Sequence, residues 1–387
     1  MNPIHKNTLV LCVSAALALC SCAVTGLAGR WTAEAELSPR NLSGLTSPGA
    51  FAAAENRAAK LPRQTPDKQI SPGLQTESPL LSFILLSDLH IQETDKESQH
   101  LLMKALIEYY TIKPDADLLV LNGDLTNGGE RDFIRLKELL SRTPHPPVHA
   151  TMGNHDYYRM WLHGGTHYDY TKLSGDWSSY QAASQFKRHF GYRRLYHETS
   201  VRGVPFLFLS GEAYRDVDES VGEDASMSDE QLNWLDGRLA ELTSRPRHTG
   251  ASGGNGPDSG SSCMPAFVFL HQPLPDTVEG SSLERGVVQH ERLRAILAKY
   301  PAVVLFSGHT HWDLEPTGQL WRGPFTAVGS GAIRGVYSAG NKPVSPLKSE
   351  SLFVEVYRDG RIAVRGRNHT DERWTGEASV IPCIKRR

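Results

Sequence analysis

Short apolar runs and longer amphipathic segments alternate along most of the chain. Five runs have strand length and few polar residues, as expected for strands buried on both faces; they span 82–87, 118–122, 147–152, 266–270 and 302–307. Apolar residues at helical spacing predict helices over 98–112, 129–141, 228–242 and 291–300. This alternation of strands and helices predicts a layered α/β domain.

Two local signals refine these elements. Ser228 begins one helix and Gln231 follows three residues later, which is the pattern of a capping box. Near the end of the chain, runs 352–357 and 361–365 flank the turn residues Asp359-Gly360. This arrangement predicts an antiparallel hairpin that completes one sheet.

A polar motif stands at the end of each of the five apolar runs. The motifs are Asp88-Leu89-His90, Gly123-Asp124, Gly153-Asn154-His155-Asp156, His271 and Gly308-His309-Thr310-His311. Open α/β sheets usually bind ligands at the carboxyl ends of their strands, so we expect the motifs to converge. Their carboxylate, carboxamide and imidazole groups suit borderline divalent metals. The set therefore predicts a dinuclear metal site.

Single members of this set also have ordinary explanations. Asp88 alone can be a turn residue at a strand end, and His271 alone can be a buried core side chain. The tetrapeptides at 153–156 and 308–311 favour a site, because each places glycine beside metal-type ligands where the backbone must turn sharply. The prediction rests on the five motifs together and in order.

In these motifs the chain resembles the calcineurin-like metallophosphoesterases, over roughly residues 81–367. The resemblance implies two packed mixed β-sheets flanked by helices, a four-layer sandwich. It also implies two divalent or trivalent metal ions, with Mn, Fe and Zn all suited to the nitrogen and oxygen ligands. The implied ligands are Asp88, His90 and His311 for one metal, Asn154, His271 and His309 for the second, and Asp124 as the bridge.

The resemblance further implies a reaction. A hydroxide between the two metals would attack phosphorus, while the metals neutralise charge on the phosphoryl oxygens. His155 would stabilise or protonate the leaving oxygen, and Asp156 would hold the His155 ring in one tautomer. We therefore expect a metal-dependent hydrolase of phosphoester bonds that acts on a small phosphorylated substrate.

Departures from other branches of the family narrow the expected substrate class. No tyrosine follows Gly123-Asp124, where purple acid phosphatases have an iron-binding one, since the run continues Leu125-Thr126-Asn127. Met152 stands where Ser/Thr protein phosphatases usually have arginine. We also expect no separate nucleotidase substrate domain after His311. The remaining resemblance is to the cyclic-nucleotide and general phosphodiesterase branch. A phosphodiesterase is favoured, and a phosphomonoesterase with the same site or a non-catalytic exported binding lipoprotein are the alternatives.

The first residues predict export. Lys6 precedes the apolar stretch LVLCVSAALALCSC, which has the length of a signal peptide and is too short to span a bilayer. Leu19-Cys20-Ser21-Cys22 resembles a bacterial lipoprotein cleavage box, so residues 1–22 are interpreted as a signal peptide of lipoprotein type. A lipid on Cys22 would tether the protein to the cell envelope. The alternative is a plain secretory signal, which would leave the protein secreted or periplasmic.

The rest of the chain divides into three predicted parts. Residues 23–79 lack sustained periodicity and are rich in Ser, Pro, Thr, Gly and Ala, which predicts a flexible linker. Residues 80–370 form the predicted catalytic domain, because one domain must hold all the ligands. Residues 371–387 are interpreted as a C-terminal tail.

Charge and cysteine usage add two constraints. The chain has 41 basic and 43 acidic residues, a net charge of −2, which gives no basic stripe and disfavours nucleic acid as a partner. Three of the five cysteines belong to the targeting segment. A disulfide between the remaining Cys263 and Cys383 is permitted by export, but their positions in the sequence leave the pairing open.

Two long segments interrupt the regular pattern. Residues 244–265 are poor in apolar side chains, which predicts a mobile surface loop. Residues 157–180 follow the 153–156 motif and carry several aromatic side chains. This second segment either forms a wall of the substrate site or packs against the domain.

Overall fold

The computed structural model describes residues 77–244, 263–281, 285–316, 318–338 and 341–384. The predicted signal peptide, the linker up to residue 76 and most of the 244–265 segment lie outside these residues. Contacts within the chain define a large unit that holds the described residues up to His167 and from Leu173 onward. Of the second unit, only Tyr168–Lys172 is described.

The described residues form helices and strands in an alternating order. The helices are α3 (Lys96–Ile112), α4 (Glu130–Arg142), η1 (His155–Trp161), α5 (Ser179–Phe190), η2 (Glu219–Val221), α6 (Asp229–Ser244) and α7 (His290–Leu297). The strands are β1 (Leu81–Leu86), β2 (Leu118–Asn122), β3 (Val148–Thr151), β4 (Leu162–His163), β5 (His167–Tyr168), β6 (His197–Val201), β7 (Val204–Phe208), β8 (Ala266–Phe269), β9 (Val303–Ser307), β10 (Leu320–Arg322), β11 (Thr326–Gly329), β12 (Tyr337–Ser338), β13 (Lys342–Pro343), β14 (Glu350–Val356), β15 (Ile362–Asn368), β16 (Arg373–Trp374) and β17 (Ser379–Ile381).

Two mixed sheets form the centre of the large unit. One has seven strands in the order β16-β15-β14-β1-β2-β3, with β17 also paired to β15. The other has six strands in the order β10-β11-β9-β8-β7-β6. Strands β1, β2 and β3 are parallel in the first sheet, and β7, β8, β9 and β11 are parallel in the second. Antiparallel strands complete both sheets, so the predicted mixed sheets are confirmed.

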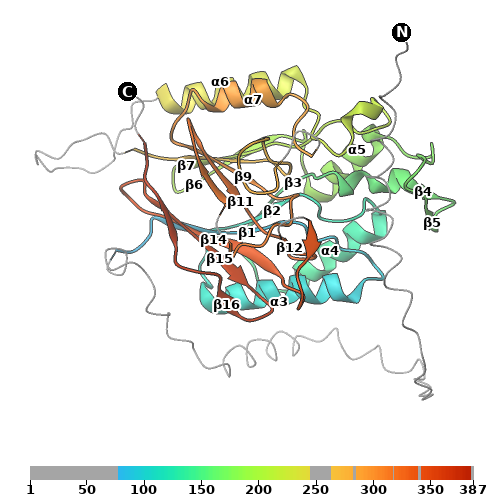
Figure 1. The fold of residues 1–387 in the computed structure, drawn as a ribbon, viewed down its shortest axis with the longest axis horizontal. Helices are drawn as coiled ribbons and strands as arrows, with labels where there is room; N and C mark the ends of the chain where they lie inside the picture. The colour runs from blue at the N-terminus through green and yellow to red at the C-terminus, as the bar shows by residue number, and fades with distance from the viewer. Residues whose placement is uncertain (1–76, 245–262, 282–284, 317, 339–340, 385–387) are drawn as a thin grey trace, which may run out of the picture. The chain divides into compact units, whose positions relative to one another are not determined.

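Alternate strand residues build the core between the sheets. The ring centroid of Phe83 on β1 lies 5.2 Å from that of Phe206 on β7 and 5.1 Å from that of Phe267 on β8. Val268, the residue after Phe267, belongs instead to the apolar cluster that forms with α6 and α7. On the other side, Tyr109 of α3 stacks on Phe353 of β14. Helices thus flank the paired sheets, which confirms the four-layer arrangement (Figure 1).

The predicted helices are present with shifted ends. Helix α3 begins earlier than expected, because the Asp95 side chain accepts hydrogen bonds from the backbone N–H groups of Glu97 and Ser98. At α6 only half of the predicted capping box forms: Ser228 Oγ accepts from the N–H of Gln231 at 3.2 Å. The carboxamide of Gln231 instead bonds the backbone of Ser210 on both sides, at 3.0 and 2.9 Å. This pair fixes the helix to the end of β7.

The end of the chain differs from the predicted tail. The predicted hairpin forms as β14 and β15, but pairing continues beyond residue 370, since β16 and β17 both add to β15. Cys263 and Cys383 form a disulfide with a Cα–Cα distance of 5.7 Å. An open sheet edge presents unpaired backbone groups, and these short strands satisfy them. The described residues therefore remain part of the domain through Ile381.

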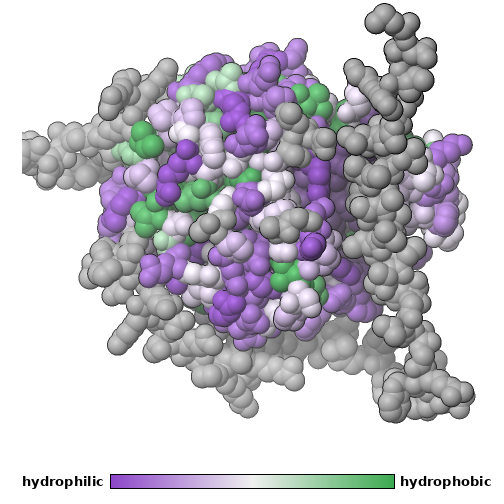
Figure 2. All heavy atoms as spheres, in the orientation of Figure 1, coloured by the Kyte–Doolittle hydropathy of each residue, from purple (hydrophilic) through white to green (hydrophobic). Residues whose placement is uncertain are grey.

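The surface drawn in Figure 2 is mostly hydrophilic. Among the described residues, none of the helices has the length and apolar character needed to cross a membrane. On the face drawn in Figure 2, hydrophobic residues lie in small separate patches among hydrophilic ones. Scattered apolar residues of this kind are normal on folded proteins.

Candidate metal centre

The carboxyl ends of five strands, three from one sheet and two from the other, bring the predicted ligands together. Asp88 and His90 follow β1, Asp124 follows β2, Asn154 follows β3, His271 follows β8, and His309 and His311 follow β9. Because the three strands within the first sheet are parallel, their ends meet at one edge. Strands β8 and β9 of the second sheet bring His271, His309 and His311 to the same place.

The loops that carry these residues have an uncommon backbone. Five of the seven adopt positive φ angles: Asp88 (56°), His90 (47°), Asp124 (50°), His309 (65°) and His311 (56°). Residues other than glycine rarely adopt this left-handed region, and such residues cluster at functional sites. Backbone hydrogen bonds maintain the turns, for example from His90 N–H to the carbonyl of Asp124 at 2.9 Å.

Two glycines in the motifs are required by close approach. A Cβ atom on Gly153 would lie 2.3 Å from Asp124 Oδ1, and one on Gly308 would lie 1.9 Å from Ser87 Oγ. Any larger residue would therefore displace a carboxylate or its hydrogen-bond partner. The glycines of the sequence motifs allow the strand ends to pack around the acidic groups.

The first group of potential ligand atoms comes from Asp88, His90, Asp124 and His311, with one atom of each within 4.8 Å of the others. His311 Nε2 lies 3.0 Å from Asp88 Oδ1 and 3.2 Å from His90 Nε2. Asp88 Oδ2 is held separately, since it accepts from Ser87 Oγ at 2.6 Å. One carboxylate oxygen of Asp88 is thus fixed and the other lies beside the imidazoles.

The second group comes from Asp124, His271 and His309. His271 Nε2 lies 3.1 Å from Asp124 Oδ2, while Asp124 Oδ1 accepts from the backbone N–H of His155 at 2.8 Å. Asp124 therefore belongs to both groups, which is the position required of a bridging carboxylate. Asn154 follows the neighbouring strand and donates from Nδ2 to Glu223 at 2.9 Å.

Hydrogen bonds determine which nitrogen of two rings is available. His271 Nδ1 lies 2.8 Å from the carbonyl oxygen of Asn122, and His311 Nδ1 lies 2.7 Å from that of Gly335. A carbonyl oxygen only accepts, so Nδ1 carries the proton in both rings. In the neutral ring this leaves the Nε2 lone pair free to bind a cation.

Unpaired buried atoms show that these residues fit a metal. Within the described part of the chain, four buried atoms of the predicted ligands make no hydrogen bond of normal geometry: Asp88 Oδ1, Asn154 Oδ1, His271 Nε2 and His309 Nε2. The short contacts of Asp88 Oδ1 and His271 Nε2 are with other members of the same cluster. Buried polar atoms are nearly always paired, so each one needs an explanation. Oxygen and imidazole nitrogen are the donors that Mn, Fe and Zn accept.

The electrostatics of the cluster also favour a positive charge. Burial lowers the pKa of His271, but the carboxylates of Asp124 and Asp88 outweigh burial and raise that pKa to about 9. Burial raises the pKa of Asp88, yet His311 and His271 lower it overall. The carboxylates stay ionised, and the proton on His271 stands where a cation would bind.

His155 lies at the edge of this cluster with its side chain partly exposed. Its Nε2 lies 3.9 Å from Asp124 Oδ2, and its Nδ1 donates to Asn127 Oδ1 at 3.3 Å. The ring stacks on Tyr158 with centroids 3.8 Å apart. Asn127 and Tyr158 therefore hold the His155 ring on one side of the shared carboxylate.

Asp156 has partners other than the one that we expected. Its Oδ1 accepts from the backbone N–H and the hydroxyl of Thr126, each at 3.0 Å, and its Oδ2 accepts from the N–H of Gly153 at 3.0 Å. Burial and Asp124 raise the pKa of Asp156 to about 7, although backbone N–H groups oppose this. Asp156 joins the loops after β2 and β3, and Asn127 takes the place beside His155 Nδ1.

The aromatic segment after His155 begins with residues in two different environments. Tyr157 donates from its hydroxyl to the carbonyl of Gly211 and is buried, and Trp161 Nε1 donates to Tyr214, so these two pack within the domain. Tyr158 instead stacks on His155 beside the ligand cluster. Packing against the domain is therefore confirmed for Tyr157 and Trp161, and a substrate wall stays a prediction.

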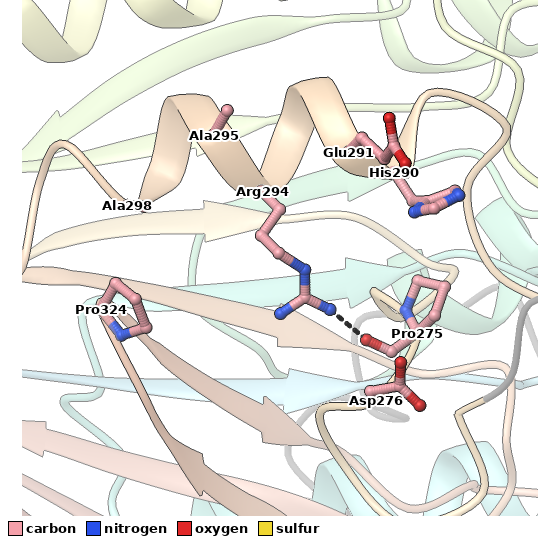
Figure 3. A pocket seen from close by; sticks show the side chains of 8 residues that line it. All are labelled: Pro275, Asp276, His290, Glu291, Arg294, Ala295, Ala298 and Pro324. Atoms are coloured by element: carbon pink, nitrogen blue, oxygen red, sulfur yellow. Dashed lines mark hydrogen bonds between the residues drawn. The ribbon is translucent and has the colours of Figure 1, made fainter.

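A separate cavity of about 610 Å³ lies along α7 (Figure 3). Pro275, Arg294 and Pro324 are among its lining residues, and Arg294 bonds the carbonyl of Pro275. None of the seven predicted ligands lines this cavity. The volume of this cavity is therefore no reason to place the reaction there.

The strand ends of the paired sheets thus share buried carboxylates and imidazoles that could hold metal ions, which is the site of a candidate metalloenzyme. The family model of the calcineurin-like phosphoesterases matches residues 81–313, which is more than half of the chain. The protein belongs to the calcineurin-like phosphoesterase family and is an enzyme of the metallophosphoesterase type.

Individual relatives are distant. A protein of Arcobacter nitrofigilis described as a probable glycerophosphodiester phosphodiesterase GpdQ is 21% identical over 236 residues, or 59% of this chain and 71% of that protein. A dimetal phosphatase from Danio rerio has a similar fold, with a TM-score of 0.55, 14% identity, and coverage of 79% of this chain and 100% of that chain. The purple acid phosphatase PPD1 of yellow lupin has a TM-score of 0.50 and 14% identity, with coverage of 77% of this chain and 52% of that chain.

Sequence reasoning did not assign roles to two residues at the site. Asn127 lies three residues after Asp124, so its proximity to the motif was a usable signal. Glu223 bonds Asn154 from 69 positions away and lies on a loop without a recognisable pattern. Such a contact is created by tertiary packing.

Proposed function

We propose that the protein hydrolyses phosphodiester bonds of small molecules with a dinuclear metal centre. The proposal rests on two groups of potential ligand atoms that share Asp124 and include buried atoms without a hydrogen bond. We assign Asp88, His90 and His311 to one metal, and Asn154, His271 and His309 to the other. The likeness to a probable glycerophosphodiester phosphodiesterase supports the diester preference.

The bound cations would activate water and neutralise charge on the phosphoryl group. Asp124 keeps the two ligand groups together because its Oδ2 lies 3.1 Å from His271 Nε2 of one group and 4.0 Å from His90 Nε2 of the other. His155, with Nδ1 bonded to Asn127, presents Nε2 on the substrate side of Asp124 and can hold a proton for the leaving oxygen. Tyr158 limits the movement of that ring by stacking.

A rate comparison tests the proposal. The purified protein is stripped with chelator and reloaded with Mn²⁺ or Zn²⁺, and initial rates are measured on a chromogenic bis-ester and on the matching mono-ester. We expect hydrolysis that requires metal and a higher kcat/KM for the bis-ester. A higher value for the mono-ester would identify a phosphomonoesterase. Hydrolysis that is absent with every metal would point to the non-catalytic binding protein.

We also propose that the protein is exported and tethered through a lipid on Cys22. The sequence pattern at 19–22 supports lipidation, and the Cys263–Cys383 disulfide is typical of an oxidising compartment. Mass spectrometry of the membrane fraction tests both parts. An N-terminal peptide that begins at an acylated Cys22 is the expected result, whereas an unmodified mature N-terminus would overturn the tether.

A further inference from the structure

Glu223 lies next to the proposed metal centre without belonging to any of the sequence motifs. It follows η2, and its side chain is 20% exposed. Its Oε2 accepts from Asn154 Nδ2 at 2.9 Å and from the Tyr158 hydroxyl at 3.1 Å. Glu223 therefore touches both a proposed metal ligand and the residue that stacks on His155.

The other oxygen of this carboxylate is equally occupied. Oε1 accepts from the Tyr214 hydroxyl at 2.8 Å and from Arg215 Nη2 at 3.1 Å. The backbone carbonyl of Glu223 accepts from Gln272 Nε2 at 3.1 Å, one residue after the predicted ligand His271. Four donors around two oxygens fix the carboxylate in position, because each oxygen has about two lone-pair sites.

A fixed carboxylate determines the orientation of the amide opposite. An ionised carboxylate only accepts hydrogen bonds, so Asn154 must present its NH₂ group to Glu223. This leaves Asn154 Oδ1 as the free atom, and it is buried without a hydrogen-bond partner among the described residues. A reversed amide would point N–H donors away from Glu223, toward the position of a cation, where they cannot bind it.

We propose that Glu223 is a positioning residue that aligns the Asn154 amide oxygen for the second metal. The proposal rests on the proposed function, since it assumes that Asn154 is a ligand. Through Tyr158 the same carboxylate also supports the ring that stacks on His155. Glu223 thus connects the metal side of the site with the leaving-group side.

The test reverses the direction of one hydrogen bond. In Asn154→Asp, two carboxylates would face each other at the distance of a hydrogen bond, and neither has a proton to donate. In the double variant Asn154→Asp/Glu223→Gln, the new amide donates to the new carboxylate, and the summed charge equals that of the wild type. Glu223→Gln alone completes the cycle, and Glu219→Gln is the matched control, because Glu219 is an exposed glutamate of the same segment.

The readout is the affinity for the more weakly bound Mn²⁺, measured by titration in metal-buffered solution, with the melting temperature as a check of folding. We expect Glu223→Gln, which replaces the fixed acceptor opposite Asn154, to weaken that affinity by about 10- to 100-fold. The double variant should recover to within about threefold of the wild type. Glu219→Gln should bind as the wild type does.

The possible results separate two failures. If the wild type binds fewer than two metals, the proposed dinuclear function is wrong. If the wild type binds two, and the losses in Asn154→Asp and Glu223→Gln simply add in the double variant, Glu223 does not position Asn154. Full affinity in both single variants would overturn the proposal equally.

Discussion

Two buried clusters in this protein combine histidine with carboxylates, and they differ in what their polar atoms contact. In the proposed metal centre, Asp88 Oδ1, His271 Nε2 and His309 Nε2 have no hydrogen bond within the described part of the chain. In the second cluster, at α3, β14 and the end of β15, His369 Nδ1 bonds Glu108 Oε2 at 2.6 Å. Its Nε2 bonds Ser351 Oγ at 2.7 Å.

The second cluster has the residue types of a nucleophilic triad, namely Glu108, His369 and Ser351. Ser351 Oγ is also bonded to the Tyr109 hydroxyl at 2.7 Å, and the side chains of Ser351, His369 and Tyr109 are fully buried. A substrate has no access to a hydroxyl in this position. The cluster is therefore a satisfied network that holds α3 against the sheet.

Unpaired buried atoms therefore identify a binding site better than residue type does. A complete hydrogen-bond network is stable without a ligand. Buried atoms that lack a hydrogen bond stabilise the protein only when a cation binds them. The pKa values differ in the same sense. Burial lowers the pKa of His369, and Glu108 does not overcome this, whereas the pKa of His271 is raised to about 9.

The largest expected effect follows removal of the shared carboxylate. Asp124→Ala should lose bound metal and lower kcat/KM by at least about 10³-fold, because the charge that holds both cations is gone. Elemental analysis beside initial rates measures this. Asp115→Ala, at an exposed aspartate bonded to Lys113, is the control and should keep both properties. Full metal content in Asp124→Ala would remove the distinction between the clusters.

His369→Ala should act on stability instead. Removing one partner of a buried, hydrogen-bonded pair should lower the free energy of unfolding by about 3 kcal/mol. Metal content and kcat per folded molecule should remain those of the wild type. Urea unfolding, with His100→Ala on the exposed face of α3 as the control, gives the measurement. A loss of metal in His369→Ala at full folding would show that the clusters are coupled.

A smaller effect is expected at His155, which has partners on one side and lies open on the other. His155→Ala should retain two metals and lower kcat by about 10²-fold, since a general acid is worth this much. The loss should shrink for substrates whose leaving group is already a good one. Rates on a series of aryl esters test this, and an equal loss across the series would contradict an acid role.

The clustering of the candidate ligands could be predicted from sequence because each lies directly after a strand-like apolar run. Local pattern and order were sufficient for Asp88, Asp124 and His309, while the two-sheet arrangement came from the family resemblance. Strand β7 was not predicted, and Pro205 within it is uncommon inside a sheet. The bond between Glu108 and His369 joins residues 261 positions apart and has no local pattern.

The smallest effect sharpens the comparison through pH. A histidine whose pKa is lowered by folding contributes stability that is present above its unfolded value of about 6.5 and is lost as pH falls below it. Glu108, with a lowered carboxyl pKa, loses its contribution only below about pH 4.5.

His369→Gln keeps a donor and an acceptor but cannot titrate. In metal-free protein, the stability difference between wild type and His369→Gln should therefore shrink by about 1 kcal/mol between pH 7.5 and 5.5. Parallel urea curves at the two pH values measure this difference. An unchanged gap would mean that folding does not shift the pKa of His369, and a gap that grows toward pH 5.5 would mean that His369 is charged in the folded protein.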